Sequence, residues 1–107
     1  MEPTTVVHRR EDHDVLIDRT TPWGNPFTHG PSSLAKWRVE TRAEAIKSFQ
    51  RWVLYSEDPA AEWIRDHLSE LQGKRLGCWC YPKDCHGRIL AALVDGHSLV
   101  DQESFPF

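Results

Sequence analysis

The chain has 107 residues, of which 27% are charged, and its formal net charge is −3 with histidine neutral. This length predicts one domain over residues 1–107 with a hydrophobic core of its own, and the ordinary composition argues against a disordered chain. The slight acidic excess argues against a protein held on nucleic acid mainly by bulk charge, while a nucleotide site or a locally basic groove stays open.

The cysteines are few and close together. All three, Cys78, Cys80 and Cys85, lie within eight positions. An odd and clustered set argues against the disulfide framework of a secreted protein and favours reduced thiols. The polar start of the chain does not resemble a signal peptide, and no run approaches the ~20 apolar residues of a membrane helix. We therefore expect a cytoplasmic protein without a membrane partner.

The first part of the chain is expected to contain short strands and a long loop. Met1–Arg10 is expected to include a short edge strand, and the apolar run Val15–Ile17 is typical of a buried strand. Two prolines and a glycine make Arg19–Phe27 a structured loop whose aromatic rings pack on other residues. Lys36–Arg38 predicts a solvated loop with one buried Trp, and a stacking and phosphate-binding patch is the alternative.

Two helices are predicted next. Thr41, followed by Glu44, predicts an N-cap with a capping box for a helix that ends near Tyr55. Asp58 predicts the cap of a second helix, because a proline follows it at the first helical position. Gly73 is the expected end of that helix.

A second strand and a third helix complete the predicted fold. Leu76–Cys80 is a short apolar run, and a helix is expected to begin near His86 and to end at Gly96. Helices between short apolar strands predict a parallel pair of strands joined by a crossover. We therefore predict a small α/β domain with a short, mostly parallel sheet and crossover helices, followed by an irregular tail over residues 97–107.

This topology predicts where a ligand site lies. Ligands of such sheets bind at the carboxyl ends of the strands. The loops that leave that end are Arg19–Phe27 and Tyr81–His86. We therefore expect Trp23 or Asn25 to lie near the turn that contains Cys85.

Cys85 and His86 are candidate catalytic residues because they precede a helix. The helix dipole and nearby cations favour a thiolate at that place. Backbone N–H groups at the helix start also suit an anion, with Arg88 as a further ligand-binding residue. A turn between Pro82 and a helix is usually exposed, so the pair is expected to be accessible and Cys85 to react faster than Cys78.

A zinc site is the second interpretation of this cluster. Cys78, Cys80, Cys85 and His86 offer the thiolate and imidazole ligands that Zn²⁺ prefers. The spacing is not that of a common zinc finger, and the adjacent pair at the helix start is hard to bring to one ion. The third interpretation is that Cys78 and Cys80 belong to the core.

The loop that follows the first buried strand offers a clamp for a flat ligand. Arg19 supplies charge, Trp23 a stacking surface and Asn25 hydrogen bonds, and Cys80 at the neighbouring strand end joins the predicted binding set. The alternative is that Trp23 and Phe27 plug the end of a small core.

The sequence resembles a family known from bacteria and phages, domain-of-unknown-function family 4326. The motifs that carry the resemblance are Arg19, Trp23-Gly24-Asn25-Pro26-Phe27, Leu76-Gly77-Cys78-Trp79-Cys80, Pro82 and Cys85-His86-Gly87. The likeness covers about residues 15–94. The last motif is also similar to family 488, in which Cys-His-Arg opens a helix, but here Gly87 separates His86 from Arg88. The resemblance implies a compact α/β fold and no established activity.

Taken together, these patterns predict a pocket at the sheet rim that binds or acts on an anionic, nucleotide-like ligand. Two alternatives stay open. One is a zinc-stabilised, phage-encoded module that binds a host protein. The other is a weak nucleic-acid binder that uses Trp37 and its flanking cations.

Overall fold

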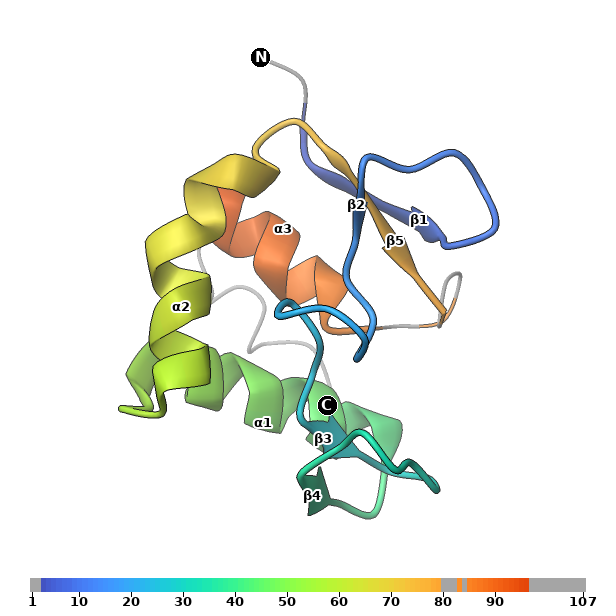
Figure 1. The fold of residues 1–107 in the computed structure, drawn as a ribbon, viewed down its shortest axis with the longest axis vertical. Coiled ribbons are helices and arrows are strands. Elements are labelled where there is room, and N and C mark those ends of the chain that lie inside the picture. The colour runs from blue at the N-terminus through green and yellow to red at the C-terminus, as the bar shows by residue number, and fades with distance from the viewer. Residues whose placement is uncertain (1–2, 80–82, 84, 97–107) are drawn as a thin grey trace.

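A computed structural model describes residues 3–79, 83 and 85–96 of the chain. The strands are β1 (Thr5–His8), β2 (Val15–Leu16), β3 (Phe27–Thr28), β4 (Trp37–Arg38) and β5 (Arg75–Cys78). The helices are α1 (Arg42–Tyr55), α2 (Pro59–His67), the 3-10 turn η1 (Leu68–Leu71) and α3 (Gly87–Asp95). Figure 1 shows these elements as short strands surrounded by three helices, which confirms the predicted α/β class.

A three-stranded parallel sheet forms the centre of the fold. Its order is β1-β5-β2, so the last strand of the chain lies in the middle. Val15 of β2 and Val6 of β1 both pair with Leu76 of β5. This confirms that the first buried strand and the cysteine-bearing strand are parallel neighbours, and that the N-terminal segment supplies an edge strand. β5 ends at Cys78, and Cys80 lies outside the described residues.

The N-terminal caps of α1 and α2 and the C-terminal cap of α3 follow the predicted chemistry, whereas α2 ends at His67, before the predicted Gly73, because the chain continues as the 3-10 turn η1. The Thr41 hydroxyl accepts the Glu44 N–H at 3.1 Å, and the Asp58 carboxylate accepts the N–H of Ala60 at 3.0 Å. Each cap satisfies a backbone donor that has no partner within its helix. Gly96 ends α3 with a φ of 74°, a left-handed conformation that glycine adopts without steric cost.

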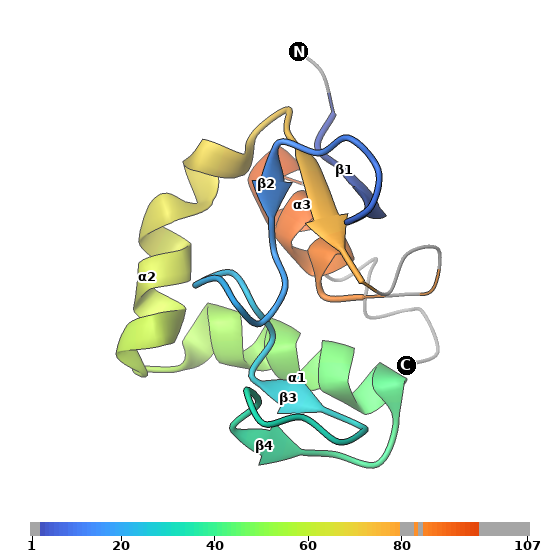
Figure 2. The same ribbon diagram turned by 45° about the vertical axis from the view of Figure 1, so that its right-hand side comes forward.

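The helices enclose one hydrophobic core. Figures 1 and 2 show α3 against one face of the parallel sheet and α1 crossing beyond the carboxyl ends of β2 and β5. The core joins side chains from the strands and from all three helices. Its largest fully buried apolar members are Phe49, Ile17, Ile64, Leu71, Leu76, Ile89, Leu90 and Val53. Because α1 crosses the sheet end rather than covering a face, residues of α1 and of the end of β5 line one cavity.

A second, very small sheet was not predicted. β3 and β4 pair in parallel over two residues each, so Phe27 lies opposite Trp37. The two rings stack with centroids 4.9 Å apart, and Trp37 is 44% exposed. The expectation of a buried Trp in this segment is therefore wrong, because the indole packs on the solvent-facing side of Phe27. In the part of the chain that the structure describes, no helix is long and apolar enough to cross a membrane.

Candidate functional site: a Cys/His cluster in a cavity

Three metal-ligating side chains meet where β5 ends and α3 begins. Cys78 is the last residue of β5, and Cys85 and His86 directly precede α3. One ligand atom from each of the three lies within 4.8 Å of the other two. The exposed fractions are 3% for Cys78, 6% for Cys85 and 7% for His86. The expectation that the Cys85–His86 pair is accessible is therefore wrong, because packing on the sheet and α1 buries the turn.

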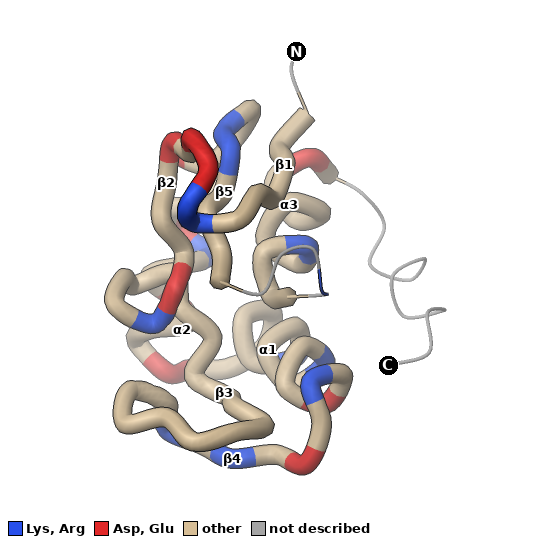
Figure 3. The backbone as a smooth tube through the Cα atoms, turned by 90° about the vertical axis from the view of Figure 1, so that its right-hand side faces the viewer, with Lys and Arg blue, Asp and Glu red and all other residues tan. Residues whose placement is uncertain are grey.

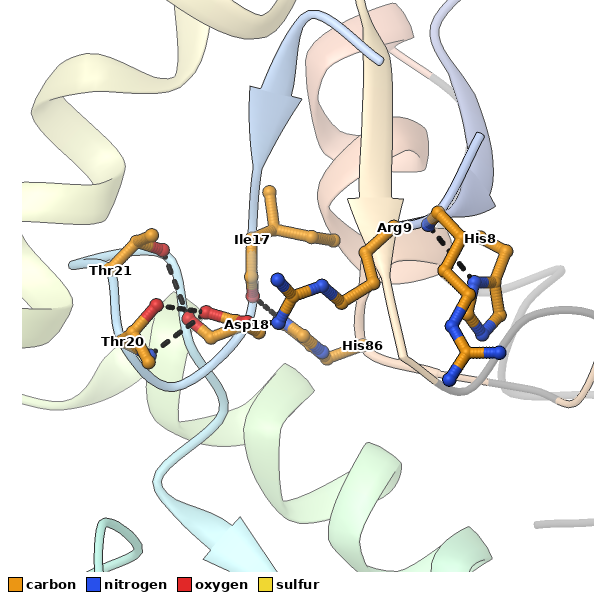
Figure 4. A network of polar contacts seen from close by, with 8 residues as sticks. His8, Arg9, Ile17, Asp18, Thr20, Thr21 and His86 are labelled. Carbon is orange, nitrogen blue, oxygen red and sulfur yellow. Dashed lines mark hydrogen bonds and ion pairs between the residues drawn. The ribbon is translucent and has the colours of Figure 1, made fainter. Parts of the chain in front are cut away.

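His86 connects two loops through its imidazole. Its Nε2 lies 2.8 Å from the Ile17 carbonyl oxygen and 3.1 Å from that of Trp23, and its ring meets Phe49 edge-on at 5.0 Å. Figure 4 shows the contact with Ile17. Because carbonyl oxygens only accept hydrogen bonds, Nε2 is the donor in these contacts. The contact with Trp23 confirms that the two rim loops meet.

The start of α3 lies unusually close to the sheet. The Cys85 Sγ accepts the Gly87 N–H at 3.3 Å. A Cβ added at Gly87 would lie 2.7 Å from the Ile17 Cδ1 and 3.1 Å from the Val6 Cγ2. Glycine at this position therefore lets the helix begin against β1 and the end of β2, and so brings Cys85 to Cys78.

The cluster forms part of the wall of a cavity of about 320 Å³. This volume is at the lower end of the range of about 300–1,000 Å³ for small-molecule sites. The lining residues come from both strand ends, the long loop, the first turns of α1 and the start of α3. They are Asp18, Arg19, Thr20, Asn25, Thr28, His29, Ser32, Leu34, Arg42, Ala45, Ile46, Cys78, Trp79, Cys85 and His86. The cavity thus lies at the sheet rim, as the topology predicted.

Asp18 carries negative charge on the cavity wall. Figure 4 shows it between Thr20 and Arg9. It accepts the Thr20 N–H at 3.0 Å and the Thr20 hydroxyl, and it lies 3.4 Å from the Arg9 Nη1. Burial alone would raise the pKa of Asp18, but these bonds, the Arg9 charge and a hydrogen bond from Trp79 together lower it. Asp18 is therefore an anion whose charge is largely matched by its own neighbours.

Arg19 and Asn25 hold the long loop in shape. The guanidinium of Arg19 donates to the carbonyl oxygens of Asn25 at 2.8 Å and Phe27 at 2.7 Å. The Asn25 amide donates to the Ala45 carbonyl at 3.1 Å and accepts the Phe27 N–H at 2.9 Å. Both side chains also line the cavity. Their hydrogen bonds are largely to the loop itself, so each has a structural role beside any role toward a ligand.

Two residues of the predicted ligand-binding set, Trp23 and Arg88, have surroundings other than this cavity. The Trp23 ring is 6% exposed and packs edge-on against Trp63 with centroids 4.9 Å apart, which agrees with the alternative that it plugs the core. Neither Trp23 nor Arg88 is among the described residues that line the cavity. Arg88 stands in the first turn of α3, partly buried. Cys80, the other member of the predicted set, lies outside the described residues.

The structure adds cavity residues that the sequence interpretation did not select. Arg42 begins α1, Asp18 follows β2, and Trp79 follows Cys78. Figure 3 shows basic residues at the starts of both α1 and α3 and in the loop between β1 and β2. Arg42 follows the predicted cap Thr41, so its place at a helix start was visible in the sequence. Its place at the cavity was not, because that depends on α1 crossing the sheet end.

Comparison with known proteins places the chain in a family. A model of the family described as "Domain of unknown function (DUF4326)" matches residues 4–96. The chain belongs to this family. It is also 37% identical over 86 residues to a protein of enterobacteria phage T4 described as an uncharacterised 12.4 kDa protein in the nrdA-td intergenic region. That match covers 80% of this chain and 71% of the phage protein. No solved structure matches the chain.

Proposed function

We propose that this protein binds an anionic, nucleotide-like ligand in the cavity, at a zinc ion held by Cys78, Cys85 and His86. The observation that carries the proposal is the coincidence of two features. The ligand atoms of the three residues lie within 4.8 Å of one another, and all three residues line the cavity. A ligand in the cavity would therefore lie beside the metal.

The donor set suits zinc. Zn²⁺ takes thiolate sulfur at about 2.3 Å in a tetrahedron, which brings two sulfur atoms to about 3.8 Å of each other, and the ligand atoms of this cluster already lie within 4.8 Å of one another. Metal-binding histidines usually donate their other ring N–H to a carbonyl or carboxylate, as the His86 Nε2 does to Ile17. Mg²⁺ and Ca²⁺ prefer oxygen ligands, which this cluster lacks.

Three ligands leave one position of a tetrahedron for the ligand or for water. Structural zinc sites usually fill all four positions with protein, whereas sites that act on ligands keep one open. The cavity beside the cluster supports the open site. Cys80 is the fourth member of the predicted ligand set. If Cys80 occupies the fourth position, the zinc-stabilised module that binds a host protein becomes the better interpretation. Zinc binding by the Cys80→Ala variant tests whether Cys80 is a ligand.

The cavity suits an anion. Arg19 and Arg42 both line it. The N-terminal ends of α1 and α3 also border it, and helix N-termini carry partial positive charge. The negative charge on the wall, Asp18, is matched by Arg9 and Thr20. A phosphate-bearing ligand therefore meets cations, helix ends and the metal together.

A metal-free reactive site at Cys85 is the competing function. The hydrogen bond from the Gly87 N–H and the helix start favour a thiolate at this sulfur. The burial of both Cys78 and Cys85 argues against this function, since a reactive thiol needs access to its substrate.

Timed alkylation with and without chelator separates the two functions. If zinc holds the thiols, Cys78 and Cys85 are protected together, chelation exposes both, and the folded protein loses stability because metal binding contributes folding free energy. If Cys85 is a free nucleophile, it labels first and at the same rate with chelator. Slow labelling of all thiols until denaturant is added contradicts both functions and assigns the cluster to the core.

Zinc thiolates also bear on location. Thiolate ligands have to stay reduced to bind the ion, and the cytosol keeps thiols reduced. We therefore place the protein in the cytoplasm of a bacterial or phage-infected cell as part of this proposal. Cell fractionation with an antibody tests that placement.

A further inference from the structure

We infer that Trp79 is a stacking platform for the aromatic base of the ligand, so that the cavity takes a nucleoside phosphate rather than a simple anion. This inference rests on the proposed anion site. Trp79 lines the cavity and is 51% exposed, whereas the neighbouring Cys78 is buried. An exposed aromatic ring in a cavity wall that also holds cationic side chains offers a face on which a flat base can stack.

The ring is fixed by contacts with the domain. The Arg9 guanidinium carbon lies 4.1 Å from the centre of the Trp79 ring, a cation–π contact. His8 meets the ring edge-on, with centroids 6.0 Å apart and planes at 86°. Asp18 pairs with Arg9 at 3.4 Å and so holds the guanidinium against the indole. An aromatic surface that is positioned before binding loses little conformational entropy when a base stacks on it.

The other exposed aromatic rings do not share this position. Trp37 stacks on Phe27, and Tyr55 is 79% exposed at the end of α1. Neither is among the described residues that line the cavity. Among the described residues, Trp79 is therefore the exposed indole that lines the cavity together with the cations Arg19 and Arg42. A base on Trp79 with its phosphate toward those cations is the arrangement that uses both features.

Isothermal calorimetry on the full-length, zinc-loaded protein tests the inference with three probes: AMP, ribose 5-phosphate and inorganic phosphate. Stacking on an aromatic side chain tightens binding by about 5- to 150-fold per base. AMP is therefore expected to bind wild-type protein tighter than ribose 5-phosphate by a factor in this range. Trp79→Ala is expected to remove that difference, because AMP loses more affinity than ribose 5-phosphate does. Trp79→Phe retains most of the difference, since phenylalanine also stacks.

Trp37→Ala is the matched control, because Trp37 is a similarly exposed indole outside the cavity wall. The inference is overturned if AMP binds wild type no tighter than ribose 5-phosphate, if Trp79→Ala keeps the difference, or if Trp37→Ala removes it equally. In each of these cases binding of ribose 5-phosphate and phosphate still supports the anion site. Absence of binding for all three probes overturns the proposed function and the inference with it.

Discussion

His86 is predicted to have two separable roles, one in holding the rim together and one in binding metal. The structural role uses Nε2, which contacts the carbonyl oxygens of Ile17 and Trp23. The metal role uses Nδ1. His86→Ala removes both roles. His86→Gln keeps an amide N–H that reaches about as far as Nε2, and it removes the imidazole ligand.

The stability cost of His86→Ala follows from the contacts it removes. Each of the two hydrogen bonds contributes about 1 kcal/mol, and a buried carbonyl left without a donor costs about 1–3 kcal/mol. Truncating a buried ring against Phe49 adds a cavity cost, which for aromatic residues in cores reaches about 3–5 kcal/mol. These effects overlap, so we expect His86→Ala to lower the free energy of unfolding by about 3–5 kcal/mol in total. That is a large part of the ~5–15 kcal/mol that stabilises a small domain.

Urea unfolding of the chelator-treated protein measures this cost without the metal. With a denaturant slope of about 1–3 kcal/mol per molar, His86→Ala is expected to lower the midpoint by about 2 M. His86→Gln is expected to stay within about 1–2 kcal/mol of wild type and yet to lose zinc affinity by at least about 100-fold. If His86→Ala unfolds within about 1 kcal/mol of the wild-type value, the assignment of His86 as the connection between the loops is wrong.

Three further outcomes are expected. Gly24→Ala is expected to lower the unfolding temperature by several degrees, because the new Cβ would lie 2.6 Å from the Arg19 Cα. Gly30→Ala, which places no atom within 4 Å of the new Cβ, is expected to leave the unfolding temperature unchanged or slightly raised, and circular dichroism compares the two variants. The pKa of Asp14 is lowered because hydrogen bonds from Arg75 favour the ionised carboxylate, so its contribution to stability is complete above about pH 4 and is lost as the pH falls through the folded pKa. Unfolding of wild type and Asp14→Asn from pH 6 to pH 2 is expected to show that the variant loses less stability on acidification. Chelation of the purified protein is expected to lower its unfolding temperature, and added Zn²⁺ to restore it; an unchanged melting curve under both treatments contradicts a stabilising metal.

The elements that the sequence predicts are those with local chemical signals. Thr41 and Asp58 cap their helices as predicted, because a cap depends only on the side chain and the next few residues. The parallel pairing of β2 with β5 follows from the helices between them. The β3–β4 pair carries no such signal, since two-residue strands are too short to show a periodicity and depend on the stack of Phe27 on Trp37.

The candidate site was predictable in position but not in detail. The topology predicted that the turn before α3 and the loop Arg19–Phe27 lie at the same edge of the sheet, and the contact of His86 with Trp23 confirms this. The burial of Cys85 could not be read from the sequence, since it depends on Gly87 letting α3 begin against the sheet. The hydrogen bonds of Asn25 to backbone groups depend likewise on the path of the loop. The type of each side chain predicted which kind of contact it makes, but the residues that it contacts depend on the fold.

Metal content is the measurement that tests the central claim most directly. Native mass spectrometry of the protein purified without chelator is expected to show one zinc ion per chain. The ion should be retained in Cys80→Ala and lost in Cys85→Ser, because Cys85 is one of the three residues whose ligand atoms meet in the cavity wall. A chain purified without metal and unable to take up zinc, or a Cys85→Ser variant that binds zinc as wild type does, would contradict the account.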